Sequence, residues 1–247
     1  LERLAASADV PGMDELIDRM SRRIDNLQHT VLAARMVPVA EVFDRFRRLV
    51  RDAARSLGKE VEYSLVGGEI EMDRELLTAL ADPILHLLRN SLDHGIEAPA
   101  ERLAAGKPVR GRLTLRVTRE RSTATIEVID DGRGIDHSRV IGRARAMGLL
   151  AEDAGETLSG EELMRLVSQP GLSTAERVSD LSGRGVGLDA VVNGVRALGG
   201  AISLESEPGS GTRLTLRLPV TLALTYALRV EVGGDLPLGA ALGHQAR

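Results

Sequence analysis

The chain has 247 residues, of which 43% are hydrophobic, 28% charged and only 2% aromatic, and its formal net charge is −4. This composition is typical of a folded protein of one or two domains and excludes a disordered or collagen-like chain. The negative charge disfavours nucleic acid as a partner, the absence of cysteine excludes disulfides and thiolate chemistry, and no apolar run is near the roughly 20 residues of a membrane span.

Residues 1–58 predict helices. Apolar residues return every three or four positions in two runs: Ile17, Met20, Ile24, Leu27 and Val31, then Val39, Val42, Phe46, Leu49 and Ala53. The first run is typical of a coiled-coil or bundle seam. Pro38 predicts a kink or break near Val37. One kinked helix cannot bury such a seam, so we expect self-association, with the intervening arginines on a solvated face.

Residues 59–219 predict an α+β fold. Alternating apolar residues indicate strands at 60–66, 112–118, 123–129, 201–205 and 212–218. Asp73 predicts the start of a short helix, Asp82-Pro83 the start of a longer one, and a further helix runs to Leu198. Loops and short helices are expected over 136–182. Helices grouped against a mainly antiparallel sheet are therefore expected.

Four polar side chains share one face of the helix expected after Asp82. On a helical projection His86, Asn90, Asp93 and Glu97 form a narrow stripe. An amide oxygen such as that of Asn90 is a ligand suited to Mg²⁺. Taken alone, such a stripe is more often an ordinary helix surface.

Three glycine-rich segments follow. Asp130-Asp131-Gly132-Arg133-Gly134 comes directly after a strand, where a carboxylate can accept a hydrogen bond from an amine and glycines let a flat ligand approach. Taken alone, this motif favours a simple Asp-Gly turn. Gly183-Arg184-Gly185-Val186-Gly187 opens a helix, which suits phosphate, although the GK[ST] of a P-loop is missing. Gly209-Ser210-Gly211-Thr212 could be a simple hairpin turn.

In this order and spacing the four segments resemble the N, G1, G2 and G3 boxes of the GHKL ATP-binding superfamily, which includes gyrase, Hsp90, MutL and histidine kinases. Residues 86–97, 130–136 and 170–189 further resemble the CheA family of chemotaxis histidine kinases, as do Leu27-Gln28, Arg35-Met36-Val37-Pro38 and Phe43. The resemblance spans about residues 14–224. It implies a GHKL (Bergerat) α/β sandwich with a mixed, mainly antiparallel sheet, preceded by a long kinked dimerisation helix.

The resemblance also implies roles for individual residues. Asp130 would meet the adenine amine, with Gly132 and Gly134 shaping the purine slot and Arg133 and Thr212 beside the base. Asn90 would hold Mg²⁺, and His86 and His94 would lie near the γ-phosphate as catalytic residues. The remaining nucleotide contacts would come from Asp93, Ser173, Thr174, Gly183, Arg184, Gly185, Val186 and Gly187, beneath a lid at 137–182.

The implied function is ATP-dependent transfer of the γ-phosphate to a histidine on a separate phosphotransfer domain, followed by relay to a response-regulator aspartate. Implied partners are a second copy of the chain, response regulators, and a CheW-like coupling protein with chemoreceptors, in the cytoplasm at receptor arrays. We expect a partial dimerisation domain at 1–58, a kinase domain at 59–219 and the start of a CheW-like domain at 220–247. Since the chain begins with Leu1, it is expected to be a piece of a longer protein, with a weak dimer because one dimerisation helix is missing. Leu172 stands where the family has Phe.

Two other functions remain open at this stage. ATP-hydrolysing clamps of the gyrase or MutL kind place a Glu four residues before the Mg²⁺-binding Asn, and His86 at that position disfavours them. A non-catalytic scaffold in a receptor array is the third possibility, which the intact motifs disfavour.

Overall fold

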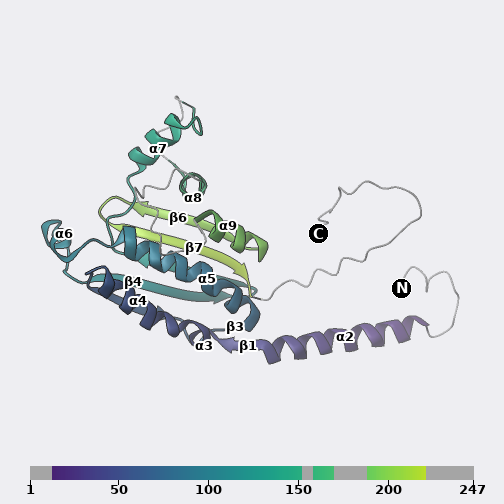
Figure 1. The fold of residues 1–247 in the computed structure, drawn as a ribbon. Helices are drawn as coiled ribbons and strands as arrows, with labels where there is room; N and C mark the ends of the chain where they lie inside the picture. Colours follow the sequence, from purple (N-terminus) through teal and green to yellow (C-terminus); the bar gives the residue numbers. More distant parts are fainter. Residues whose placement is uncertain (1–12, 152–157, 170–187, 221–247) are drawn as a thin grey trace.

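The computed structural model describes residues 13–151, 158–169 and 188–220 (Figure 1). Its centre is a five-stranded sheet of order β2-β4-β5-β7-β6. The strands are β2 (Val61–Val66), β4 (Gly111–Glu120), β5 (Thr123–Asp130), β6 (Ala201–Glu207) and β7 (Gly211–Pro219). β2 and β4 run parallel and the other neighbours in this sheet antiparallel. The five predicted strands and the mixed, mainly antiparallel sheet are confirmed.

Helices cover one face of this sheet. Figure 1 shows α4 (Arg45–Ser56), α5 (Arg74–Asn90) and α9 (Leu188–Ala197) lying across it. The two faces of the sheet differ because residues of β4 alternate between them: Leu113, Leu115 and Val117 are buried in the core, whereas Arg112 and Thr118 are exposed. The shorter helices α7 (His137–Ala146) and α8 (Gly160–Val167) follow β5, and α8 contacts β6.

The N-terminal helix α2 (Met13–Arg35) extends away from the sheet (Figure 1). It ends at Arg35, and β1 (Met36–Pro38) then pairs antiparallel with β3 (Glu71–Asp73). The predicted kink or break near Val37 is thus confirmed as a break. Apolar side chains of the predicted seam are exposed, at 55% for Met20, 51% for Ile24 and 65% for Leu27.

The helices after the break belong to the main core. Phe43, in α3 (Val39–Phe43), stacks on Phe46 of α4 with 5.1 Å between ring centroids, and neither ring is exposed. The predicted stripe of this segment is partly wrong, because Leu49 is 43% exposed and Val50 is buried instead. Because α4 packs against both α5 and β2, its buried residues are Phe46, Val50 and Ala54, which lie four positions apart. The core therefore continues across residue 58.

A single long helix, α5, replaces the two predicted ones. Its start is as predicted, since the Asp73 carboxylate accepts a hydrogen bond from the Glu75 amide at 2.8 Å. Pro83, expected to open a second helix, lies inside α5. Proline inside a helix costs about 3 kcal/mol, but buried leucines and isoleucine on both sides of it hold the helix against the core. Within the described residues, no helix has the length and apolar content needed to cross a bilayer.

Candidate functional site

A carboxylate is buried where β5 ends. Asp130 is only 5% exposed, and it accepts hydrogen bonds from the Ser91 hydroxyl at 2.8 Å and the Gly132 amide at 3.0 Å. Burial raises the pKa of Asp130, while these hydrogen bonds and one from the Thr212 backbone act in the opposite direction. A carboxylate has about four acceptor sites, so Asp130 is equipped to accept a further hydrogen bond from a ligand.

The glycines after Asp130 let the loop approach neighbouring backbone. Gly134 has a φ of +67°, and a Cβ on it would lie 2.0 Å from the carbonyl oxygen of Glu207, the last residue of β6. A Cβ on Gly132 would lie 2.3 Å from the carbonyl oxygen of Gly95. No other residue fits at either position without moving backbone. The structure thus gives both predicted site glycines a packing role, in addition to any role toward a ligand.

The polar end of α5 changes helical type. α5 ends at Asn90, and the chain continues as a π-helical turn, η1 (Ser91–Gly95), in which the Ile96 amide donates to the Ser91 carbonyl at 2.7 Å. Ile96 is extended, which takes Glu97 off the helix. The prediction that Glu97 shares the polar stripe is therefore wrong, because the wider turn and the extended residue after it break the helical spacing.

His86 lies among charged groups from three elements. Burial and the nearby Arg89 lower the pKa of its imidazole, whereas Asp189 in the first turn of α9 and Asp93 in η1 act in the opposite direction. The lowered pKa favours the neutral form of His86. Among the other predicted residues here, Asn90 and Asp93 are half-buried and His94 is exposed.

Two predicted residues flank Asp130 on other segments. Thr212 is the partner of Asp130 in the β5–β7 ladder, and its hydroxyl lies 3.0 Å from that of Ser206. Arg133 forms an exposed ion pair with Glu101 of α6 (Pro99–Ala104) at 2.9 Å. The structure therefore brings Thr212 next to Asp130 and ties the Arg133 guanidinium to α6.

The predicted phosphate-binding segment is not among the described residues. Ser173, Thr174, Gly183, Arg184, Gly185, Val186 and Gly187 all lie outside them, as does Leu172. Sequence reasoning missed Ser91 and Asp189, which approach Asp130 and His86 through the tertiary fold. Their only sequence signal is their position. Ser91 directly follows Asn90, and Asp189 is the second residue after the glycine-rich segment that ends at Gly187.

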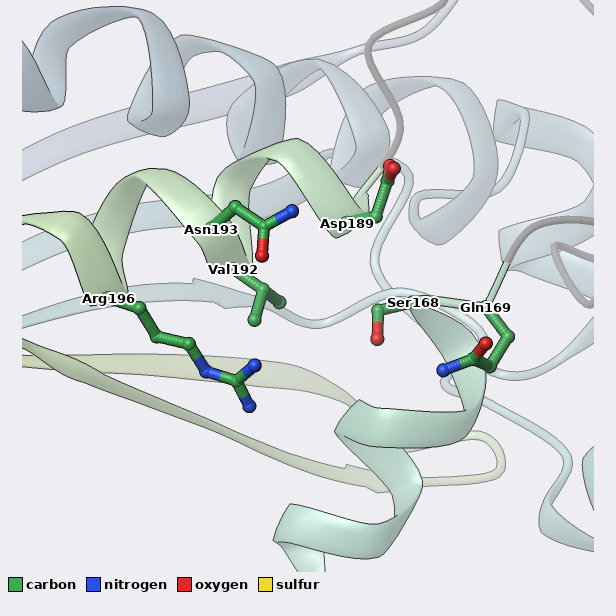
Figure 2. A pocket seen from close by; sticks show the side chains of 6 residues that line it. All are labelled: Ser168, Gln169, Asp189, Val192, Asn193 and Arg196. Carbon is green, nitrogen blue, oxygen red and sulfur yellow. The ribbon is translucent and has the colours of Figure 1, made fainter. Parts of the chain in front are cut away.

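A cavity of about 230 Å³ lies between the end of α8 and one side of α9 (Figure 2). Its lining comes from α9 and from the two residues that follow α8, and none of the predicted site residues lines it. The lining residues are Ser168, Gln169, Asp189, Val192, Asn193 and Arg196.

The residues at the end of α5 fit a magnesium ion held together with a phosphate ligand. In the described part of the chain, no three histidine or acidic side chains are grouped as a metal site. Mg²⁺ needs no such cluster, because it usually keeps several waters and is held by one or two side chains plus substrate phosphates. The half-buried amide of Asn90 can serve as one such ligand.

Comparison with known proteins agrees with this geometry. Residues 79–222 match the family of histidine kinase-, DNA gyrase B- and HSP90-like ATPases. The chain is 40% identical over 232 residues to the chemotaxis protein CheA of Bacillus subtilis, covering 94% of this chain and 34% of the relative. It is 44% identical over 227 residues to CheA of Salmonella typhimurium, covering 91% and 33%.

A third relative carries a different functional name. The gliding motility regulatory protein of Myxococcus xanthus is 42% identical over 223 residues, covering 90% of this chain and 29% of that protein. The chain thus spans about a third of the length of the curated relatives that it matches. The resemblance to chemotaxis kinases inferred from the sequence motifs is confirmed. By the match over more than half of its length, the chain belongs to the family of histidine kinase-, DNA gyrase B- and HSP90-like ATPases.

Proposed function

We propose that this chain is the catalytic part of a chemotaxis-type histidine kinase. It transfers the γ-phosphate of ATP to a histidine on a separate phosphotransfer domain, for relay to a response-regulator aspartate. The observation that carries the proposal is the buried Asp130 carboxylate at the end of β5, held by neutral donors beside the polar end of α5.

Asp130 selects adenine by hydrogen-bond chemistry. The exocyclic amine of adenine is a donor, and guanine carries a carbonyl acceptor at the same ring position. A buried carboxylate accepts a hydrogen bond from the adenine amine. With guanine the carboxylate would face a carbonyl oxygen, and two unpaired acceptors in a site without water cost binding free energy. Thr212, opposite Asp130 in the sheet, lies beside the same ligand edge.

Asn90, Asp93, His86 and His94 serve the phosphate end of the nucleotide. Asn90 would hold Mg²⁺, which when bound neutralises phosphate charge and orients the transferred group. Burial lowers the pKa of the His86 imidazole and so favours its neutral form, which has a ring nitrogen able to accept a hydrogen bond or a proton. The segment with Gly183, Gly185 and Gly187, which opens α9, is proposed to border the phosphates.

His86 also distinguishes the kinase from an ATP-hydrolysing clamp. Clamps of this superfamily have a Glu four residues before the Asn, where it activates water. Here that position holds the half-buried imidazole of His86 in place of a carboxylate. This supports transfer to a protein acceptor over hydrolysis.

The proposed partners are those that the sequence resemblance to chemotaxis kinases implies. They are a second copy of the chain through α2, a phosphotransfer domain, response regulators, and a CheW-like coupling protein that links the kinase to chemoreceptor arrays in the cytoplasm. Residues 1–58, 59–219 and 220–247 remain the proposed dimerisation, kinase and regulatory portions, with α3 and α4 of the first range packed into the core of the kinase portion.

The test is phosphoryl transfer with radiolabelled ATP. The chain is mixed with Mg²⁺, γ-labelled ATP and a purified phosphotransfer domain from one of the chemotaxis relatives. Label on the acceptor histidine is the expected result, and Asn90→Ala and Asp130→Asn should each abolish it. Asn26→Ala, an exposed asparagine on α2, is the matched control and should label the acceptor at the wild-type rate.

Two results would contradict the proposal. Phosphate release that is equally fast with and without the acceptor would identify a hydrolysing clamp. Tight ATP binding with neither transfer nor hydrolysis would identify a scaffold.

A further inference from the structure

Lysine is rare in this chain. Of its 32 lysine and arginine residues, only Lys59 and Lys107 are lysines. Each of the two ammonium groups contacts a pair of consecutive backbone carbonyls, and the two pairs lie in the two loops that carry the candidate site.

Lys107 holds the loop that follows Asp130. Its Nζ donates to the carbonyl oxygen of Asp131 at 3.0 Å, to that of Gly132 at 2.6 Å and to the Glu97 carboxylate at 2.8 Å. An ammonium group has three donors, so all three are used. The orientation of the two peptide groups just after Asp130 is thereby fixed.

Lys59 holds the π-helical turn η1. Its Nζ, reaching from the segment between α4 and β2, donates to the carbonyl oxygens of Leu92 at 2.5 Å and Asp93 at 3.1 Å. A cation at the C-terminal end of a helix also interacts favourably with the carbonyls there. The contact fixes the turn that presents Asp93 and His94 directly after Asn90.

The two loops form one packed unit. The Arg133 amide donates to the Gly95 carbonyl at 2.9 Å, and Gly132 packs against the same carbonyl so closely that a Cβ would clash. One lysine therefore braces the strand side of the contact and the other braces the helix side. A shift of either loop moves Asp130 relative to Asn90.

A neighbouring arginine shows why lysine is required. Arg102 is fully buried and spreads its planar guanidinium over separate acceptors: the carboxylates of Glu97 at 3.0 Å and Asp131 at 2.9 Å, and the carbonyl oxygens of Pro108 at 2.7 Å and Asp131 at 3.2 Å. A guanidinium presents its donors in a flat, rigid fork, whereas an ammonium directs three donors toward acceptors that converge on one point. Arginine at position 107 or 59 would keep the charge but not these convergent contacts.

We infer that Lys59 and Lys107 are positioning residues of the nucleotide site, which hold η1 and the loop of residues 131–133 in register through their ammonium groups. The inference rests on the proposed function, since it concerns how that site is preorganised. Each lysine acts through the backbone of the loop that it contacts.

The experiment measures nucleotide affinity and amide hydrogen exchange for the full chain with Lys59→Arg, Lys107→Arg, and the matching methionine variants. Loss of hydrogen bonds from a charged donor should raise the Kd for ATP with Mg²⁺ about tenfold or more in each variant. Without nucleotide, exchange should become faster at residues 91–96 in the Lys59 variants and at 131–133 in the Lys107 variants.

Two controls separate positioning from general stability. Arg48→Lys changes an arginine whose side chain is 82% exposed and should alter neither readout. Leu218→Ala removes a buried side chain near the far end of β7, so it should lower the thermal midpoint without changing ATP affinity or exchange in the two loops.

The outcomes are distinguishable. Wild-type ATP affinity in the arginine variants, or faster loop exchange without loss of affinity, would overturn the inference. If an arginine variant does not fold, the methionine variant, which keeps the aliphatic stem, decides by the same two readouts. If the wild-type chain binds no nucleotide, the proposed function fails, and exchange alone then shows whether the lysines hold the loops.

Discussion

The Ser91 hydroxyl donates a hydrogen bond of 2.8 Å to the Asp130 carboxylate, and it joins residues 39 positions apart. Ser91 is the first residue of η1 and directly follows Asn90, while Asp130 is the last residue of β5. This one contact fixes the strand end proposed for adenine relative to the helix end proposed for Mg²⁺.

Replacing Ser91 by alanine should therefore weaken nucleotide binding. The buried carboxylate loses one of its donors, and hydrogen bonds to charged groups contribute about 1.5–3 kcal/mol, so the Kd for ATP should rise about tenfold. Calorimetric titration measures this. Ser64→Ala, which removes a hydroxyl contact to Thr114 in β4, is the matched control and should bind like wild type. Equal affinities for all three proteins would remove Ser91 from the site.

The stability of Asp130→Asn relative to wild type should increase as the pH rises. Burial raises the folded-state pKa of Asp130, so the folded protein holds this proton more tightly than the unfolded chain does. Ionisation above the ordinary aspartate pKa of about 4 therefore costs wild-type stability, and the cost is complete above the raised folded pKa. Thermal unfolding without nucleotide from pH 4 to 7.5 should show the variant gaining on wild type with rising pH. Parallel curves for the two proteins would contradict the burial argument.

Much of the fold was predictable because the signals are local. Strands such as β4 and β5 bury alternate residues, and a strand needs no distant information to show that pattern. Asp73 marks a helix start by its own side-chain chemistry. The order of the four polar segments also identified Asp130 and Asn90 as candidates.

What failed depended on tertiary packing. Pro83 stays inside α5 because buried residues on both sides of it pack against the core. Val50 is buried in place of Leu49 because α4 packs against two elements at once. Glu97 was misplaced by a π-helical turn that no periodicity reveals. The contacts of Lys59 and Lys107 with backbone carbonyls join residues 24 to 34 positions apart, and the sequence hints at them only through the rarity of lysine.

Asn90→Ala should abolish the contribution of magnesium to nucleotide affinity. If the Asn90 amide is the protein's ligand to the ion, wild type should bind ATP more tightly when Mg²⁺ is added, and the variant should show no such gain. Titrations with and without Mg²⁺ measure both values, and circular dichroism checks that the fold is intact. A full magnesium-dependent gain in the variant would remove Asn90 from the metal site.

The exposed apolar stripe of α2 should cause weak self-association. Leu16, Met20, Ile24 and Leu27 are all more than half exposed, and full burial of a large apolar side chain contributes about 1.5–3 kcal/mol. Sedimentation velocity should show a concentration-dependent dimer that Ile24→Glu or Leu27→Glu disrupts. Leu49→Glu, on an exposed position of α4, is the control and should not change it.

A shortened chain tests the same surface. The cut belongs at Met36, directly after α2, because a start near Lys59 would remove Phe43 and Phe46 from the core. The chain from Met36 should be monomeric. A dimer that survives dilution to nanomolar concentration in the Leu27→Glu variant would show that another surface associates.

The central claim, that Asp130 recognises adenine in a kinase nucleotide site, is tested most directly by titrating wild type and Asp130→Asn with ATP and with GTP in the presence of Mg²⁺. An unpaired buried polar group costs about 1–3 kcal/mol, so wild type should prefer ATP over GTP by about tenfold or more, and the variant should lose both ATP affinity and this preference. Equal affinity of wild type for ATP and GTP, or unchanged ATP affinity in Asp130→Asn, would contradict the claim.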